Sequence, residues 1–350
     1  MRNLKYYTKK KRKKRKARRK ALRESGSHLK ELYRVYLENI NPITVPLALI
    51  SQIQRSGGSL LSQLFDGHPE IHAHPHELKI GHPKKHIWPN IDLNANPKKW
   101  FEILFEANVL EHFAKGYKKG QKSEKTLPFI FLPSLQLKIF LKYIDSVESI
   151  TQRDVFDAYM TSYFGAWLNN QNICGEKKFI VAFTARLAMI KDSVEKFFGI
   201  YQDGRLISII RDPKNWFPSA LRHDDKKRKY VDIKEALNQW QENAQAILRN
   251  KEKYKSRICI IRFEDLISDT NSVMRHLADF LTIEFDDILL KPTFNRFPIE
   301  ANTSFESESP GIMISTLSRY KTLTQEELDI VDELTEDVYQ EVLRHAVKFE

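Results

Sequence analysis

An apolar run followed at once by a glycine-rich turn constrains the fold of this chain more than any other segment. Leu47 to Ile53 has the length of a buried strand, Arg55-Ser56-Gly57-Gly58-Ser59 follows it, and apolar residues then recur at helical spacing from Leu60 to Phe65. This order predicts a strand, a loop and a helix that ends at Gly67. Glycines let a backbone approach a ligand, and the first N–H groups of the helix point into the loop. We expect an anion-binding loop, although a tight turn that only needs two glycines has the same pattern.

A second strand pattern ends in a comparable way. Arg205 to Ile210 is apolar and runs into Arg211-Asp212-Pro213, where Asp212 can cap a helix that begins at Pro213. Arg211 then lies at the carboxyl edge of a sheet, and Ser219 lies about two turns into the helix. Ligands of open parallel sheets bind at that edge. The two loops can therefore contact one nucleotide, although Arg-Asp-Pro alone is also typical of a surface cap.

Strand and helix patterns alternate along the rest of the chain. They predict an α/β three-layer fold with a central parallel sheet and a P-loop-like strand, loop and helix at the phosphate site. Residues 81–172 are largely helical in pattern and are interpreted as an insertion over the sheet. We expect one domain at 29–350, with 1–28 as a disordered basic tail. Further strands are expected at Ile71 to His74, Phe179 to Phe183 and Ile258 to Ile261, and helices at Leu29 to Asn39, Trp100 to Phe113, Val155 to Leu168, Asp192 to Phe198, Ile233 to Leu248 and after the capping box that starts at Thr324.

The positive charge is concentrated at the N-terminus. Residues 1–23 carry 14 of the 57 Lys and Arg residues and no acid, so the remaining 43 bases nearly balance the 45 acids. Such a block self-repels and binds polyanions or anionic membrane surfaces, or it is only a solvated tail. The two cysteines, Cys174 and Cys259, form no metal-ligand or disulfide pattern. With no apolar segment long enough to cross a membrane, we expect a cytoplasmic protein, free or peripheral at a membrane surface.

Taken together, these segments resemble the sulfotransferase family, which uses 3'-phosphoadenosine 5'-phosphosulfate (PAPS) and no metal. Arg55 to Leu61 followed by His68-Pro69 is similar to the family's 5'-phosphosulfate loop, and Arg211-Asp212-Pro213 with Ser219 is similar to its 3'-phosphate site. Arg262-Phe263-Glu264-Asp265-Leu266 and, more loosely, Asn302 to Tyr320 also resemble family segments. The resemblance implies a sulfotransferase whose PAPS site contains Arg55, Ser56, Gly57, Gly58, Ser59, Leu60, Arg211 and Ser219. Gly58 departs from the pattern, because the family usually has a threonine hydroxyl there.

Sulfuryl transfer to a hydroxyl needs a base and cations on the leaving phosphate. Arg55 and Arg211 can supply the cations, and the resemblance places a glutamate or histidine base near the end of the second strand, where His76 and Glu77 stand. We favour Glu77. Six histidines between His68 and His86 lack a familiar ligand spacing, so we expect no metal site. The acceptor hydroxyl could belong to a lipid, a carbohydrate or another molecule.

Two other functions fit parts of the sequence. An ATP-dependent phosphate-loop kinase would use the same loop, but the chain lacks the G-x-x-x-x-G-K-[ST] string of such enzymes. A polyanion-binding or membrane-surface-binding protein would act through residues 1–23, and its affinity would fall steeply with salt. We do not expect binding to a specific nucleic acid.

Overall fold

A computed structural model describes residues 26–80, 86–117, 126–223, 230, 232–299 and 314–349. The chain forms two compact units. One contains Leu132–Leu168 and the described part of Met1–Ile43, and the other contains the described parts of Thr44–Phe131 and Asn169–Glu350. Residues 1–25 of the expected tail lie outside the described residues, whereas 26–38 form a helix, as the apolar spacing from Leu29 predicts.

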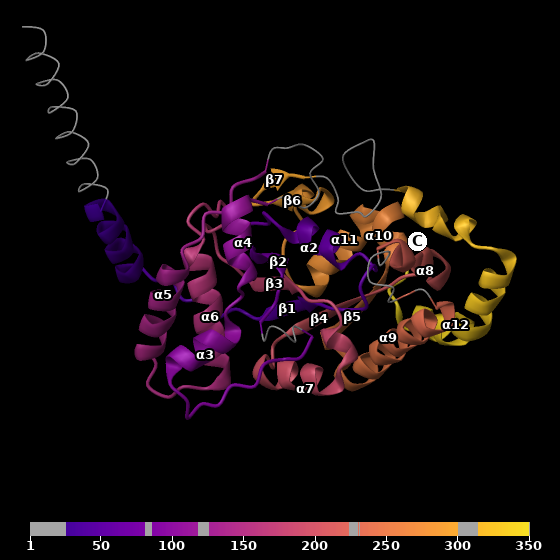
Figure 1. Cartoon of the computed structure of the whole chain (residues 1–350), viewed down its shortest axis with the longest axis horizontal. Coiled ribbons are helices and arrows are strands. Elements are labelled where there is room, and N and C mark those ends of the chain that lie inside the picture. The colour runs from indigo at the N-terminus through magenta and orange to yellow at the C-terminus, as the bar shows by residue number, and fades with distance from the viewer. Residues whose placement is uncertain are drawn as a thin grey trace, which may run out of the picture. The chain divides into compact units, whose positions relative to one another are not determined.

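The larger unit is built on a five-stranded sheet in the order β2-β3-β1-β4-β5, and every pair of neighbouring strands is parallel (Figure 1). The strands are β1 (Leu47–Ile50), β2 (Ile71–Glu77), β3 (Phe179–Phe183), β4 (Arg205–Ile210) and β5 (Ile258–Arg262). All five are almost entirely buried, which is why the sequences of β1, β3, β4 and β5 are mostly apolar rather than alternating, whereas β2 buries three histidines. The predicted parallel α/β fold is confirmed.

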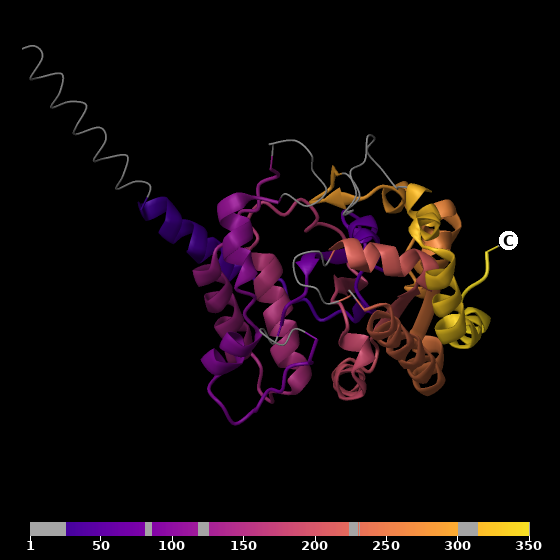
Figure 2. The same cartoon turned by 45° about the vertical axis from the view of Figure 1, so that its right-hand side comes forward.

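Helices cover both faces of this sheet, as Figures 1 and 2 show. On one face, α2 (Gly58–Phe65), α10 (Phe263–Ser268) and α11 (Thr270–Phe280) bury apolar side chains against every second residue of the strands. On the other face lie α7 (Lys191–Ile200) and α9 (Ile233–Tyr254), and α12 (Gln325–His345) packs on α9. α12 begins at the expected capping box of Thr324 and Glu327.

The remaining elements of the larger unit are short. α8 (Pro213–His223) follows β4, and α3 (Pro97–Leu104) and α4 (Asn108–Lys115) lie between β2 and the smaller unit in sequence. The other elements are η1 (Leu187–Met189), η2 (Lys255–Arg257), η3 (Asp287–Leu290), η4 (Ile314–Thr322) and a two-stranded ribbon of β6 (Thr293–Phe294) and β7 (Phe297–Pro298).

Several boundaries differ from the sequence prediction, among them the three that follow. β1 ends at Ile50 rather than Ile53, because the backbone N–H of Ile53 turns to Asn243 Oδ1 on α9, at 2.8 Å. β2 continues to Glu77 beyond a register shift after Ala73. The helical pattern from Trp100 to Phe113 forms two helices, since the buried Glu106 between them turns its carboxylate inward to His74 and to the backbone of Lys79.

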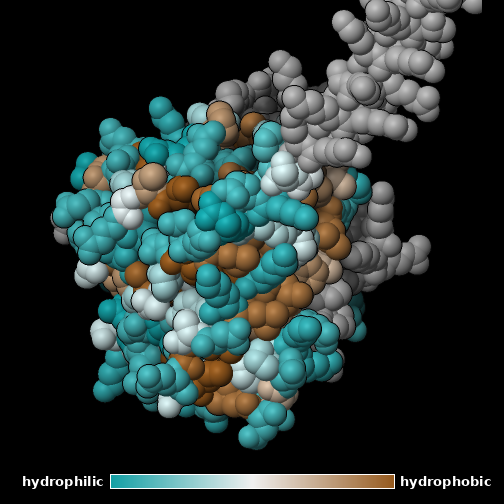
Figure 3. All heavy atoms as spheres, turned by 90° about the vertical axis from the view of Figure 1, so that its left-hand side faces the viewer, coloured by the Kyte–Doolittle hydropathy of each residue, from teal (hydrophilic) through white to brown (hydrophobic). Residues whose placement is uncertain are grey.

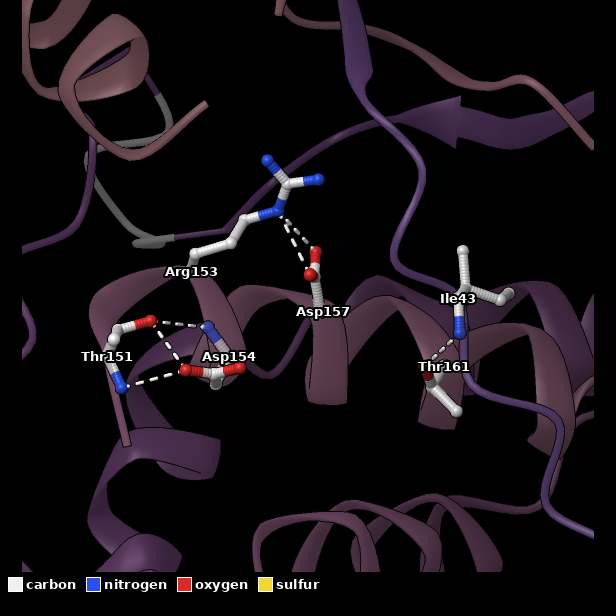
Figure 4. Close-up of polar contacts among 6 residues, drawn as sticks. All are labelled: Ile43, Thr151, Arg153, Asp154, Asp157 and Thr161. Carbon is white, nitrogen blue, oxygen red and sulfur yellow. Dashed lines mark hydrogen bonds and ion pairs between the residues drawn. The ribbon is translucent and has the colours of Figure 1, made fainter. Parts of the chain in front are cut away.

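The smaller unit pairs α5 (Pro133–Asp145) with α6 (Gln152–Ala166) and includes the helix at 26–38. α6 starts with a capping box between Thr151 and Asp154, as Figure 4 shows. Figure 3 looks at the side that carries α5, where apolar side chains reach the surface between hydrophilic ones; Leu29 and Val35 of this unit are among the exposed apolar residues. Within the described residues, no helix combines the length and the apolar content needed to span a membrane.

Candidate functional site

The loop after β1 is held in place through its backbone. The Trp216 indole on α8 donates a hydrogen bond to the carbonyl of Gln54 (2.9 Å), and Arg211 Nη1 donates to the carbonyl of Arg55 (2.8 Å). The Ile53 N–H is bound by Asn243, as described above. Anchors from three different elements therefore fix the loop before any ligand binds, which lowers the entropy lost on binding.

Two residues of this loop have a left-handed backbone. Arg55 has a φ of 72° and Gly57 a φ of 92°. Only glycine fits at position 57, because a Cβ there would also lie 2.6 Å from the Phe263 ring. For Arg55 the left-handed conformation costs on the order of 1 kcal/mol, a strain that is common at ligand sites. The conformation supports the sequence interpretation of this segment as a ligand loop rather than a simple turn.

The N-terminus of α2 faces into the loop. No side chain caps it, so the N–H groups of its first turn, those of Gly58, Ser59 and Leu60, have no helical partner. The Leu60 side chain packs in the core, so its backbone is the part that a ligand can reach. Ser56 Oγ is buried and has no hydrogen-bond partner in the described part of the chain. These groups form a cradle suited to a phosphate or sulfonate.

The second loop is built as the sequence predicts. The Asp212 carboxylate accepts the N–H of Lys214 (2.8 Å), so Asp212 caps α8 and Pro213 is its first residue. Arg211 is buried; its Nη2 donates to the carbonyl of Thr316 (3.1 Å), and its guanidinium lies 4.2 Å from the centre of the Phe263 ring. Arg211 thus links the loop after β1, the loop after β4 and η4.

The residues expected to bind the nucleotide come together at one edge of the sheet. β1 and β4 are hydrogen-bonded neighbours, so Arg55 and Arg211 leave the same edge on adjacent strands. Arg55 Nε lies 3.4 Å from Ser219 Oγ, which is fully buried on α8. Arg55, Arg211 and Ser219 are therefore brought into a single cluster, as we expected from the two separate motifs.

A third guanidinium, Arg319 on η4, belongs to the same cluster and was missed from the sequence. Burial, followed by the charges of Arg211 and Arg55, lowers the pKa of Arg319 to about 9. Burial likewise lowers the pKa of Arg211 to about 10, against the attraction of Glu264. Three cations that destabilise one another form a site suited to an anion. The loose resemblance of 302–320 to a family segment was the only signal for Arg319.

Glu264 binds the backbone of the second loop. Its Oε1 accepts the N–H of Asp212 (3.2 Å), while Oε2 is buried without a hydrogen-bond partner among the described residues. Burial raises the pKa of this carboxyl to about 7. The segment Arg262 to Leu266, which the sequence marked only by resemblance, therefore positions the turn that carries Arg211.

The two candidate bases lie at the end of β2 in different surroundings. The Glu77 carboxylate is partly exposed and accepts the N–H of Ala185 at 3.4 Å, just beyond β3. The His76 ring is buried and stacks on His112 of α4, with ring centres 3.6 Å apart. Glu77 is therefore the more exposed of the two, whereas His76 is part of an aromatic cluster.

His74 forms a buried ion pair next to these residues. Its Nδ1 contacts the carbonyl of His76 (2.9 Å) and its Nε2 contacts Glu106 Oε1 (3.0 Å), and both partners can only accept. Burial opposes charge on the ring, but the Glu106 carboxylate outweighs it and raises the pKa of His74. Glu106, between α3 and α4, and the His76 backbone thus hold the His74 ring next to the register shift of β2. No group of three or more potential ligands in the described ranges is placed to hold a metal ion.

This α/β protein has a loop with left-handed residues at the carboxyl edge of its parallel sheet. A second basic loop from the neighbouring strand joins it, an arrangement suited to anionic ligands. Comparison with known proteins makes the class specific. The model of the sulfotransferase family matches residues 46–287, which is well over half of the chain and includes both loops. This chain belongs to the sulfotransferase family and is a sulfotransferase.

Solved structures of sulfotransferases are also similar to this chain. The sulfotransferase domain of the curacin biosynthetic pathway is 19% identical, with a TM-score of 0.46 and coverage of 84% of this chain and 99% of that one. The sulfotransferase domain of the Synechococcus PCC 7002 olefin synthase is 19% identical, with a TM-score of 0.47 and coverage of 89% of this chain and 98% of that one. A sulfotransferase from Alicyclobacillus acidocaldarius is 15% identical, with a TM-score of 0.41 and coverage of 84% of this chain and 97% of that one. No curated protein sequence matches the chain.

Proposed function

We propose that the enzyme transfers a sulfuryl group from PAPS to the hydroxyl of an acceptor. The observation that carries this proposal is the hydrogen bond from Arg211 Nη1 to the Arg55 carbonyl, which joins the two basic loops 2.8 Å apart at the edge of the sheet. PAPS has anionic groups at both its 3' and its 5' positions. One basic loop for each anionic end is the arrangement that such a molecule requires.

The chain's own groups fit the two ends of this molecule. The cradle of Gly57, Gly58 and the α2 N-terminus, with the buried Ser56 hydroxyl, suits the 5' end, and Arg211 with Ser219 suits the 3'-phosphate. Arg319 adds a cation that either end could use. When bound, PAPS supplies the sulfuryl group and a phosphate leaving group. Arg55 would stabilise the charge that develops on that phosphate, because its side chain reaches from the first loop to Ser219 on α8.

We assign Glu77 as the base that takes the proton of the acceptor hydroxyl. Its carboxylate is partly exposed at the edge of the sheet that carries the cradle, two strands from β1. A positioned carboxylate can accept a proton and hold the hydroxyl in line for attack. His76 is the alternative base, and its packing against His112 would have to open for that role.

The acceptor is proposed only as a hydroxyl compound, carried on a lipid, a carbohydrate or another molecule. Residues 1–23 would bring the enzyme to anionic surfaces on which such acceptors lie, since each base near a charged membrane contributes about 1 kcal/mol. Flotation with anionic vesicles should be lost when residues 1–23 are deleted and should weaken with salt. Equal flotation of the shortened chain would reject this role.

Calorimetric titration with 3'-phosphoadenosine 5'-phosphate (PAP), beside ATP with magnesium, tests the nucleotide assignment. We expect PAP to bind in the micromolar range and ATP at least about tenfold more weakly, because ATP offers no 3'-phosphate to Arg211. Arg211→Ala should weaken PAP binding roughly ten- to a hundredfold, since it removes a charged hydrogen-bond donor. Arg319→Gln should act in the same direction.

Arg205→Ala is the matched control. Arg205 begins the strand that Arg211 follows, and its guanidinium bonds only to the nearby carbonyls of Asp203 and Gly204. This variant should bind PAP like the unmodified chain. Preference for ATP, or PAP binding that is indifferent to Arg211→Ala, would overturn the assignment and favour a kinase.

A further inference from the structure

Gln52 has a side chain whose burial is not explained by its contacts. The residue is 1% exposed, yet neither its amide nitrogen nor its amide oxygen has a hydrogen-bond partner within the described residues. Its backbone, in contrast, is fixed, because the Gln52 carbonyl accepts the N–H of Arg186 at 2.8 Å. A buried polar group without a partner costs free energy, so native proteins retain few of them.

The amide lies beside Gly58, a residue of the phosphate cradle. A Cβ built on Gly58 would lie 2.3 Å from Gln52 Nε2, so the amide fills the space that a side chain at position 58 would occupy. Gly58 is the first residue of α2, whose N-terminus no side chain caps. Ser56 Oγ, the other buried polar atom of the loop without a partner, lies on the other side of Gly57 in sequence.

The Gln52 amide lies where a side-chain hydroxyl is missing at position 58. Gly58 departs from the threonine that the sequence resemblance led us to expect, and the site loses one hydrogen-bond donor there. An amide has two N–H donors and can turn either end to a ligand. Gln52 therefore brings a donor to the place where the glycine removed one.

We propose that the Gln52 side-chain amide binds the 5' anionic group of the nucleotide in place of a hydroxyl at position 58. This inference rests on the proposed function and extends it to a residue outside the Arg55–Ser59 motif. Gln52 acts as a binding residue: it donates to an oxygen of the 5' group and takes no part in proton transfer. The Phe183 ring, which also lies 2.3 Å from a Cβ at position 58, closes the remaining space.

Calorimetry with PAP and with adenosine 3'-phosphate, which lacks the 5' group, separates this contact from general effects. Gln52→Leu keeps the volume and removes the donor, and it should weaken PAP binding about ten- to thirtyfold while changing the affinity for adenosine 3'-phosphate less than about twofold. Gln52→Glu keeps the shape and places a carboxylate against the anion, so it should weaken PAP binding further. This nearly isosteric variant keeps the test valid should Gln52→Leu fail to fold.

Gln136→Leu is the matched control. Gln136 on α5 is equally buried and its amide also lacks a hydrogen-bond partner among the described residues, but it lies in the other compact unit. It should leave PAP affinity unchanged. PAP binding that survives Gln52→Leu within twofold, or equal losses for PAP and adenosine 3'-phosphate, overturns the inference alone. No PAP binding by the unmodified chain overturns the proposed function and the inference with it.

Discussion

The polar side chains of α6 and those of the phosphate site differ in what they bind. In α6, Arg153 Nε lies 2.9 Å from both oxygens of Asp157, one turn away, and Thr151 exchanges hydrogen bonds with Asp154 in the capping box (Figure 4). Farther along the helix, Thr161 Oγ1 accepts the N–H of Ile43 at 2.8 Å. These groups find partners within their own unit.

In the phosphate site, by contrast, several buried polar groups lack partners within the described residues. Arg55 and Arg211 have no carboxylate within ion-pair distance in the described ranges, and the same part of the chain offers no hydrogen-bond partner to the Ser56 hydroxyl or the Gln52 amide. Burial lowers the pKa of both guanidiniums, that of Arg211 against the attraction of Glu264, so the free protein bears a cost there. The comparison teaches that removing a polar group should cost stability in α6 but function in the site.

The largest expected effect is on turnover. Glu77→Gln should lower kcat about 10²- to 10⁴-fold, because a carboxamide cannot accept the acceptor's proton. PAP affinity and melting temperature should stay close to those of the unmodified enzyme, since the Glu77 side chain is partly exposed and its hydrogen bond to the Ala185 N–H is long, at 3.4 Å. Steady-state kinetics with a sulfuryl acceptor, together with PAP titration, measures both.

His76→Asn is the counterpart of this variant. The His76 ring packs against His112, so its loss should lower stability more than Glu77→Gln does and reduce kcat less. The reverse result, with kcat preserved in Glu77→Gln and abolished in His76→Asn, would assign the base to His76 and would show that packing does not separate function from stability here.

Glu264 gives an intermediate effect that depends on pH. Because burial raises the pKa of its carboxyl to about 7, the folded protein holds a proton that the unfolded chain releases near 4.5. The free energy of unfolding should therefore fall as the pH rises from 4.5 to 7, by on the order of 1 to 3 kcal/mol. Glu264→Gln keeps the oxygen that accepts the Asp212 N–H and cannot ionise. It should be more stable than the unmodified protein at pH 8 and equally stable at pH 4.

Urea unfolding at the two pH values measures this difference. A gain in stability of the same size at both pH values would show that ionisation of Glu264 is not its cause. The buried carboxylate would then not be what destabilises the folded protein at high pH.

The smallest effect is expected in α6. Thr151→Ala removes the side-chain half of the capping box and should lower the free energy of unfolding by about 1 kcal/mol, with no change in PAP affinity. Thr151→Ser keeps the hydroxyl and should retain most of the stability. A change in PAP affinity in Thr151→Ala would contradict the separation between α6 and the site.

The sequence predicts those parts of the fold and site that local chemistry determines. Continuous apolar runs mark buried parallel strands, so β3 and β4 were located to the residue, and Asp212-Pro213 fixed the start of α8. The glycines and arginines that follow two strands then predicted that both loops meet at one edge. This step needed only the rule that ligands bind beyond the carboxyl ends of such strands.

The rest depends on contacts between distant residues. Arg319 joins the cluster only because η4 packs against Arg211, and nothing next to it in sequence marks a ligand site. The break between α3 and α4 lies at Glu106, whose carboxylate is buried against His74. In the sequence, Glu106 fits a continuous helix, and nothing near it indicates the contact with His74. Gln52 looked like part of a strand, and its role follows only from the space beside Gly58.

The bond from Arg211 to the Arg55 carbonyl joins residues 156 positions apart, and Arg211 reaches another 105 positions to Thr316. A ribosome must therefore release most of the chain before the two basic loops and η4 can meet, and contacts of such long range form slowly. A nucleotide that binds only when both loops and η4 are in place should stabilise the folded state. PAP added during refolding should therefore raise the fraction of refolded protein by mass action.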